Sequence, residues 1–249
     1  MKNVIVLFSL IALISISVNA QQNRAIPSEK PKLIVEIVVS QMRFDYITRY
    51  WDKFSDGGFK LLVNEGANCK NARYNYLLTQ PYPGISTIST GTNPSMHGII
   101  SDKWYSRANG QEVLAVNDEK ATTVGGSFFS GKASAKNLVT STLGDELILN
   151  NPKSKVIGIS LDAGSAILLT GHNASGVYWF DQEKGTFVTS SYFAEKIHVW
   201  LDTFNQKGFS KLYVDRECKA LNPINTYEEA DIDKVKSVET KQRLLDKLK

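Results

Sequence analysis

Hydroxyl side chains, glycines and prolines gather in one stretch, residues 76–98, with the sequence YLLTQPYPGISTISTGTNPSMHG. It follows a run at 69–76 that alternates like a strand, and residues 85–90 are compatible with the first turns of a helix. The N-terminus of a helix offers free backbone N–H groups and a partial positive charge, which suit a nucleophilic hydroxyl beside a bound anion. A surface loop rich in small residues accounts for the same composition, so both interpretations stay open.

The chain contains three histidines, which are the other side chains that could do chemistry. His97 lies in M-H-G-I, His172 in G-H-N, and His198 within a predicted helix. No two of them have the short spacing of a zinc-binding pair. We therefore interpret all three as structural residues.

The elements that must position these side chains alternate between strands and helices, which predicts an α/β sheet with helices on both faces. An apolar, β-branched run at 32–39 (KLIVEIVV) is typical of a central strand buried on both faces, and 156–161 repeats the pattern. Further predicted strands are 69–76 and the two strands of a hairpin, 177–181 and 186–189, with its turn at Lys184-Gly185. We assign the W-F-D sequence of this hairpin to packing. The predicted helices are 42–54, 59–64, 140–149 and 192–204. Residues 101–137, with an Asn109-Gly110 turn, have little hydrophobic periodicity and predict a surface excursion.

The two ends of the chain predict segments outside this fold. Residues 1–20 carry Lys2, an apolar run and small residues at the end, which is typical of a cleaved signal peptide and predicts a periplasmic or secreted protein. Residues 21–31 are polar and predict a flexible lead-in. Residues 228–249 form a charged tail, in which apolar positions within 235–249 fit either an amphipathic helix or a frayed terminus.

Composition narrows the class of protein. A hydrophobic content of 42% and a charged content of 22% are ordinary for a globular protein. The formal net charge of +4 comes from interspersed acidic and basic residues, so we predict no nucleic-acid partner, and no stable membrane span after removal of the leader. Cys69 and Cys218 would meet an oxidising compartment, where either a disulfide or two free thiols is compatible with the sequence.

Five separated motifs, in order, resemble the PafA-type secreted alkaline phosphatases, within the superfamily that includes the type I phosphodiesterases and nucleotide pyrophosphatases. They are VVSQMRFDY (38–46), GGFKLLVNEG (57–66), STGTNPSMHGI (89–99), GHNASGVYWFD (171–181) and LNPINTY (221–227). The resemblance covers residues 32–227. It implies an alkaline-phosphatase-like, mostly parallel sheet flanked by helices, incomplete because only the N-terminal part of the family fold is matched.

The resemblance also implies which positions would carry the chemistry, and this chain departs from the family at each one. The family's nucleophilic threonine falls at Pro81, which has no hydroxyl; Thr79 or Ser86 could replace it only if the turn shifted register. A metal-binding aspartate falls at Ser40, a neutral group that is a poor ligand for Zn²⁺. The phosphate-binding positions fall at Asp102, Asp162 and Gly164, where the family has an asparagine, a lysine and an arginine; Lys103 is a weak substitute.

These departures predict a catalytically inactive, truncated relative of a zinc-dependent phosphate monoesterase, with no cofactor of its own where the family uses two zinc ions. Two alternatives remain. One is a binding module that uses the vestigial cleft or an exposed sheet edge, and the other is the N-terminal half of a split phosphatase or phosphodiesterase. The corresponding partners would be a second copy of the chain, in a homo-oligomer, or a complementary C-terminal half.

Overall fold

The computed structural model describes residues 31–108, 110–214, 216 and 223, and the chain divides into two units, Met1–Met42 and Arg43–Lys249. Both the predicted tail helix and Cys218 lie outside the described residues. The proposed pairing of Cys69 with Cys218 therefore stays a prediction, with Cys69 itself exposed.

The described part of the first unit contains no strand, so the predicted strand at 32–39 is wrong for this structure. Its apolar side chains are open to solvent; Leu33, Val35 and Ile37 are 78%, 69% and 79% exposed. A parallel strand is stabilised by hydrogen bonds to neighbouring strands and by burial of its faces, and neither is present among the described residues. High β-propensity alone does not order such a run.

The second unit begins with short helices, α2 (Asp45–Arg49), the 3-10 helix η1 (Trp51–Lys53) and α3 (Phe59–Glu65). The single helix predicted at 42–54 is thus broken at Tyr50, and none of its residues is buried, so no packed face extends it. Phe54 and Phe59 instead stack across the glycine turn with ring centroids 5.1 Å apart. The α3 prediction is confirmed to within one residue.

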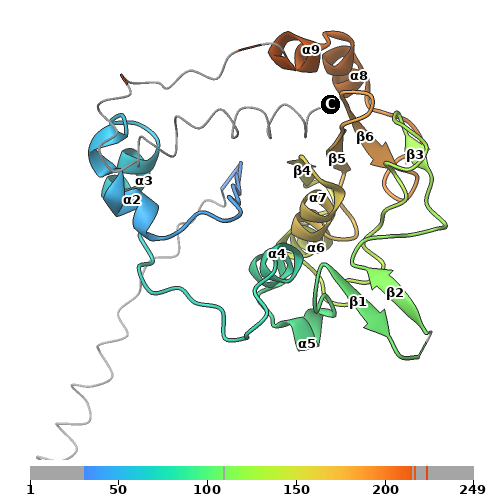
Figure 1. The fold of residues 1–249 in the computed structure, drawn as a ribbon, viewed down its shortest axis with the longest axis horizontal. Coiled ribbons are helices and arrows are strands. Elements are labelled where there is room, and N and C mark those ends of the chain that lie inside the picture. The colour runs from blue at the N-terminus through green and yellow to red at the C-terminus, as the bar shows by residue number, and fades with distance from the viewer. Residues whose placement is uncertain (1–30, 109, 215, 217–222, 224–249) are drawn as a thin grey trace, which may run out of the picture. The chain divides into compact units, whose positions relative to one another are not determined.

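The main body is a four-stranded sheet in the order β3-β6-β5-β4, formed by β3 (Thr123–Val124), β4 (Ile157–Ser160), β5 (Gly176–Asp181) and β6 (Thr186–Ser190), and shown in Figure 1. Within the described residues β4 and β5 are parallel, whereas β5–β6 and β3–β6 are antiparallel, so this part of the sheet is mixed. The 177–189 hairpin is confirmed, and Gly185 adopts the left-handed φ of 68° that its turn needs.

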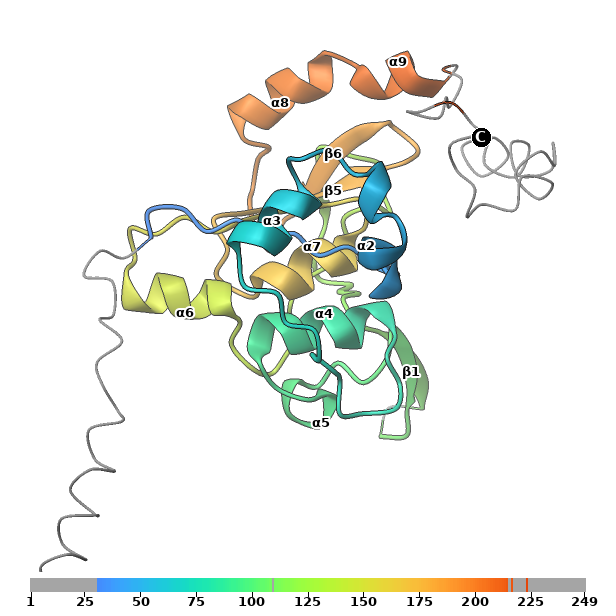
Figure 2. The same cartoon turned by 90° about the vertical axis from the view of Figure 1, so that its left-hand side faces the viewer.

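Helices pack on the sheet and on one another. α7 (Ala163–Thr170) packs on β4 and β5, and α4 (Pro81–Thr90) packs on α7, while α6 (Leu143–Asn150) adjoins both helices (Figures 1 and 2). α5 (Pro94–His97), α8 (Val199–Gln206) and α9 (Phe209–Val214) complete the described helices. The core of this body is largely apolar; the largest side chains under 2% exposed include Tyr178, Ile99, Leu138, Ile167, Leu168, Val177 and Val188.

Four other predictions are corrected by the second unit. Residues 69–76 form no strand, because Tyr74 and Tyr76 bind α4 instead: their hydroxyls contact the Gly84 carbonyl at 3.3 Å and Thr87 Oγ1 at 3.0 Å. The helix predicted from 192 begins only at Val199, since residues 191–198 turn back onto the end of β6. The α6 helix begins at Leu143 rather than at residue 140, because Thr142 is its N-terminal capping residue. β4 is buried at Gly158 but exposes Ile157 and Ile159.

The excursion predicted at 101–137 is in fact partly core. It contains β3 and an antiparallel ribbon of β1 (Lys103–Ser106) and β2 (Gln111–Leu114). Ala115, Ala121, Ala133 and Ala135 are at most 5% exposed. Small alanines pack closely without producing a hydrophobic period, which is why the sequence pattern missed them.

Candidate functional site

The N-terminus of α4 lies where the sequence predicted a nucleophile, and it is built around a proline. Gln80 is the capping residue, extended at φ −74° and ψ 164°, and Pro81 is the first helical residue. Proline is favoured there because its missing N–H would have no helical partner and its ring fixes a helical φ. Pro81 therefore starts the helix four residues earlier than the predicted Ile85.

The next residue, Tyr82, connects this helix end to two other elements. Its backbone N donates to Asp102 Oδ1 at 2.9 Å, and its hydroxyl donates to Asp162 Oδ1 at 2.9 Å. Asp102 directly precedes β1, and Asp162 is the N-cap of α7. Three of the positions predicted from the family, Pro81, Asp102 and Asp162, are thus brought together, with Tyr82 between the two carboxylates.

Gly164, the fourth predicted position, lies directly against the ring of Tyr82. A Cβ atom at Gly164 would be only 2.2 Å from Tyr82 Cζ and 2.4 Å from Cε1. Contacts this short are not tolerated, so a side chain at 164 and the ring at 82 exclude each other. The tyrosine ring occupies the space into which an arginine at position 164 would have to project.

The Asp162 carboxylate and the backbone at Asp102 are held by further hydrogen bonds. Asp162 Oδ1 also accepts from Ser165 N at 2.8 Å, which is a helix N-cap bond, and Ser160 Oγ lies 3.3 Å from Oδ2. Gln80 Oε1 accepts from Asp102 N at 2.9 Å and from Ser101 Oγ at 2.6 Å. The group of Tyr82, Asp102, Asp162 and Gly164, called the Tyr82 cluster below, is therefore joined by structural bonds.

The electrostatics of the Tyr82 cluster oppose an anion. Burial raises the pKa of the Tyr82 hydroxyl, and the negative charges of Asp162 and Asp102 raise it further, so the phenol stays a neutral donor. Lys103, the predicted substitute cation, instead pairs with Glu112 on β2 at 3.4 Å. A phosphate dianion at the cluster would face two carboxylates at short range.

The remaining hydroxyl candidates are poorly placed. Ser86 is fully buried in α4, and its Oγ has no hydrogen-bond partner among the described residues, so it is shut off from a substrate in solvent. Thr79 is exposed in the segment before α4, outside the helix whose N–H groups would bind an anion. Ser40 is an exposed turn residue of the other unit.

Each histidine is engaged by protein groups. His97 is buried; its Nδ1 accepts from Ile99 N at 3.2 Å, which leaves Nε2 to donate to Thr87 Oγ1 at 3.2 Å, and burial lowers its pKa. His172 Nδ1 faces Asp145 Oδ2 at 3.0 Å and its Nε2 faces the Leu138 carbonyl at 2.8 Å. His198 Nε2 lies 3.5 Å from the Ser175 carbonyl. These contacts agree with a structural role for all three.

Metal binding was tested on the donors that the described residues provide. No three His, Cys, Asp or Glu side chains converge among them as a metal site requires. The two carboxylates of the Tyr82 cluster are occupied by helix-capping and phenol hydrogen bonds. The described residues therefore do not fit a two-zinc centre, and we derive no chemical step through one.

Residues 34–246 match the family described as "Type I phosphodiesterase / nucleotide pyrophosphatase". The chain belongs to this family. The predicted resemblance is thereby confirmed on a match that covers most of the sequence.

Individual members of the family agree with this assignment. The chain is 38% identical over 242 residues to alkaline phosphatase PhoV of Synechococcus elongatus, covering 94% of this chain and 44% of that protein. It is 38% identical over 227 residues to alkaline phosphatase PafA of Elizabethkingia meningoseptica, covering 90% and 41%. The chain thus spans less than half the length of these relatives.

The crystal structure of wild-type PafA matches with a TM-score of 0.74 at 39% identity, over 76% of this chain and 37% of that one. This agreement confirms the predicted alkaline-phosphatase-like α/β fold. No helix within the described residues is long and apolar enough to cross a membrane.

Sequence reasoning missed Tyr82 and Asp145, the two residues that organise the described region. A signal for Asp145 was available, since T-x-x-D at 142–145 is a capping sequence in front of an apolar run. Tyr82 gave no such signal, because its partners lie 20 and 80 residues further along the chain.

Proposed function

We propose that this chain is a non-catalytic member of the phosphodiesterase/alkaline phosphatase family. The observation that carries the proposal is the Tyr82 cluster, in which two carboxylates stand at positions predicted to bind phosphate and the ring of Tyr82 lies against the third such position, Gly164. Pro81, at the predicted nucleophile position, has no hydroxyl and serves as the first residue of a helix. Nucleophile, oxyanion stabilisation and metal ligands are each typically worth orders of magnitude in rate, and here all three depart together.

Purified protein is expected not to hydrolyse an aryl phosphate or a bis-aryl phosphodiester above the no-protein rate in the presence of zinc. A phosphoryl transfer needs a nucleophile in line with the phosphorus, and Pro81, at the position predicted for the nucleophile, has no hydroxyl. Release of the aryl alcohol, followed by absorbance, measures this.

Thr79→Ala is the matched control for trace activity. Zinc-dependent turnover that Thr79→Ala abolishes would contradict the proposal and identify a relocated nucleophile. Turnover that is unaffected by Thr79→Ala would point to a contaminating phosphatase, which a second purification step removes.

The free edge of β4 favours a second candidate function. The chain would then serve either as one half of an assembled enzyme or as a binding module. Ile157, Ile159 and Leu161 are 55%, 59% and 73% exposed, and β5 is the only described strand that pairs with β4. An apolar, unpaired edge is a template for another strand. Adding the C-terminal half of a family member as a separate chain distinguishes an assembled enzyme from an inactive protein: restored hydrolysis would support the first and contradict the second.

Export from the cytoplasm forms part of the proposed function and rests on residues 1–20. Cleavage after Ala20 is expected to leave Gln21 as the first residue, because small residues precede that bond as signal peptidase requires. Mass spectrometry of the protein recovered from periplasm and medium measures the N-terminus. Recovery of chains that still begin with Met1 would contradict export by this route.

A further inference from the structure

A short loop next to β3 exposes two adjacent phenylalanines. Phe128 and Phe129 are 73% and 79% exposed, and their rings meet edge to face with centroids 4.9 Å apart. By contrast, Val177, Tyr178, Trp179 and Val188 of β5 and β6 are buried. Two contiguous exposed phenyl rings are an unfavourable surface in water unless something covers them.

Hydrogen bonds fix the base of this loop to the sheet, so the fold itself holds Phe128 and Phe129 in solvent. Buried Asp181 on β5 accepts from Ser127 N at 2.6 Å and from Ser130 Oγ at 3.1 Å. Trp179 Nε1 donates to the Ser130 carbonyl at 2.6 Å. Thr123 Oγ1 donates to the Phe128 carbonyl at 3.0 Å, and Gly131 N donates back to Thr123 Oγ1 at 2.7 Å.

The glycines at the base make the loop tighter still. A Cβ at Gly126 would lie 2.5 Å from Val188 Cγ1, and one at Gly131 would lie 2.4 Å from Thr123 Cα. The backbone is therefore pressed against β6 and β3. The loop cannot fold over to bury its rings without breaking these contacts.

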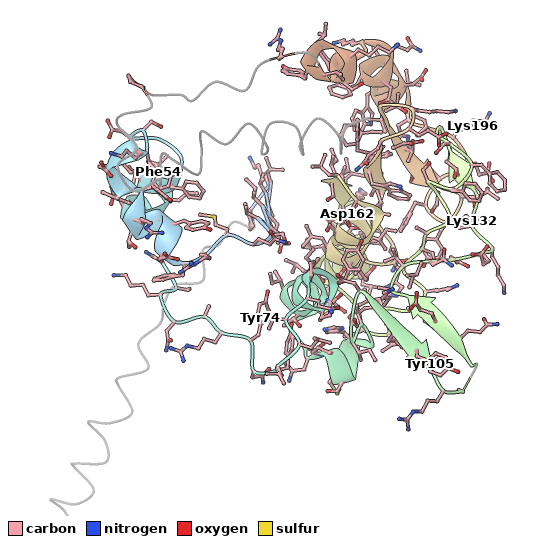
Figure 3. All side chains as sticks on the ribbon, in the orientation of Figure 1. Phe54, Tyr74, Tyr105, Lys132, Asp162 and Lys196 are labelled. Carbon is pink, nitrogen blue, oxygen red and sulfur yellow. The ribbon has the colours of Figure 1, made fainter. Side chains whose placement is uncertain are left out.

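Charge around the loop is arranged in a definite pattern. The segment between Lys120 and Lys132 contains no charged residue, so a lysine stands at each end of an uncharged tip. Lys132 Nζ lies 5.4 Å from the centroid of the Phe128 ring and also pairs with Glu119 at 2.8 Å. Lys196 lies at the same end of the sheet, because the neighbouring residue Ile197 closely approaches Gly125. Figure 3 labels both Lys196 and Lys132.

From these observations we infer that the 127–130 loop is a membrane-surface anchor, inserting Phe128 and Phe129 into a bilayer that carries anionic phospholipids. A bilayer adapts to a convex tip, whereas a protein partner would need a matched concave pocket. The apolar tip would enter the acyl boundary while Lys120, Lys132 and Lys196 stay among the phosphate groups, as in other interfacial segments. Glu119 and the exposed Glu195 oppose these lysines in part, so the rings provide most of the affinity.

Co-sedimentation of the exported chain with vesicles of phosphatidylglycerol and phosphatidylethanolamine tests the inference. Wild type is expected to bind, and the double variant Phe128→Ser/Phe129→Ser to lose at least about tenfold in partition coefficient, because the two rings that would insert into the bilayer are removed. Lys120→Gln is expected to weaken binding by about fivefold on these vesicles and not on pure phosphatidylcholine.

Tyr105→Ser is the matched control, since Tyr105 is a comparably exposed aromatic (66%) on β1. It should bind as wild type does, and all variants should keep the wild-type thermal transition because the altered side chains lie in solvent. Failure of wild type to sediment with vesicles, or equal binding by the double variant, would overturn the inference. So would lipid-free dimers in light scattering that the double variant lacks, which would show a second copy covering the rings.

Discussion

Replacement of Asp145 by alanine is expected to destabilise the fold by about 3–5 kcal/mol, because it removes a buried carboxylate that accepts several hydrogen bonds. Asp145 is 1% exposed. Its Oδ2 faces Thr142 N at 3.0 Å and His172 Nδ1 at 3.0 Å, and its Oδ1 accepts from His172 N and Asn173 N at 2.9 and 2.8 Å. Without the carboxylate, the buried Thr142 N–H and the half-buried His172 donors lose their acceptor.

Urea unfolding followed by circular dichroism measures this change. Asp145→Asn, which keeps an acceptor but loses the charge, should fall between wild type and Asp145→Ala. Asp202→Ala is the matched control: Asp202 is an exposed helical aspartate whose carboxylate accepts from Gln206 Nε2, so its removal should change stability by less than about 0.5 kcal/mol. A loss below about 1 kcal/mol in Asp145→Ala would contradict the described network.

The Asp145 effect should also depend on pH. Burial by itself raises the pKa of Asp145, but hydrogen bonds from His172, Thr142 and Asn173 outweigh burial and hold the pKa below its ordinary value. Since the folded pKa is lower than the unfolded one, the ionised carboxylate stabilises the fold above about pH 4 and the contribution is lost as the pH falls through the folded value. The unfolding curves of wild type and Asp145→Asn should therefore converge on acidification.

Replacement of Tyr82 by alanine is expected to cost about 2–3 kcal/mol of stability, below the usual value for a core aromatic because Tyr82 is half-buried. The ring packs on Gly164 and its hydroxyl ties α4 to the N-terminus of α7. Tyr82→Phe should lose about 1 kcal/mol, the worth of one partly exposed hydrogen bond. Such losses would show that the Tyr82 cluster stabilises the fold, whereas groups kept for catalysis often reduce stability.

Tyr105→Ala provides the comparison for Tyr82→Ala, because Tyr105 is 66% exposed and its loss should cost less than about 0.5 kcal/mol. Chemical denaturation of the three variants side by side gives the differences. Equal stability of Tyr82→Ala and Tyr105→Ala would show that the tyrosine ring is not seated against Gly164, and the Tyr82 cluster would have to be abandoned.

Local patterns predicted the elements whose stability is local. The 177–189 hairpin follows from alternation around Lys184-Gly185, whereas the β-branched run that predicted β4 forms a strand because β5 pairs with it. The run at 32–39 carries an equally strong pattern but forms no strand in the described region, because a strand needs partners that its own residues cannot supply. α7 was missed since Gly164 lowers helix propensity and the helix is apolar on most of its faces.

In the candidate site, too, single positions could be predicted from the sequence, but contacts between distant positions could not. Resemblance to the family identified Pro81, Asp102, Asp162 and Gly164 as altered positions, each in isolation. It could not indicate that the alterations fit together, because the ring of Tyr82 can occupy this space only when position 164 has no side chain. That dependence spans 82 residues of sequence and becomes visible only when α4 and α7 are packed.

Binding of inorganic phosphate is the most direct test of the claim that the Tyr82 cluster closes the former oxyanion site. Isothermal titration calorimetry of the purified protein, with and without zinc, should give no saturable heat, since the phosphate would have to displace a seated ring and approach two carboxylates. Tyr82→Phe should behave identically, because it keeps the ring. Saturable binding of phosphate by the wild type with a Kd below about 1 mM, equivalent to about 4 kcal/mol, would contradict the account.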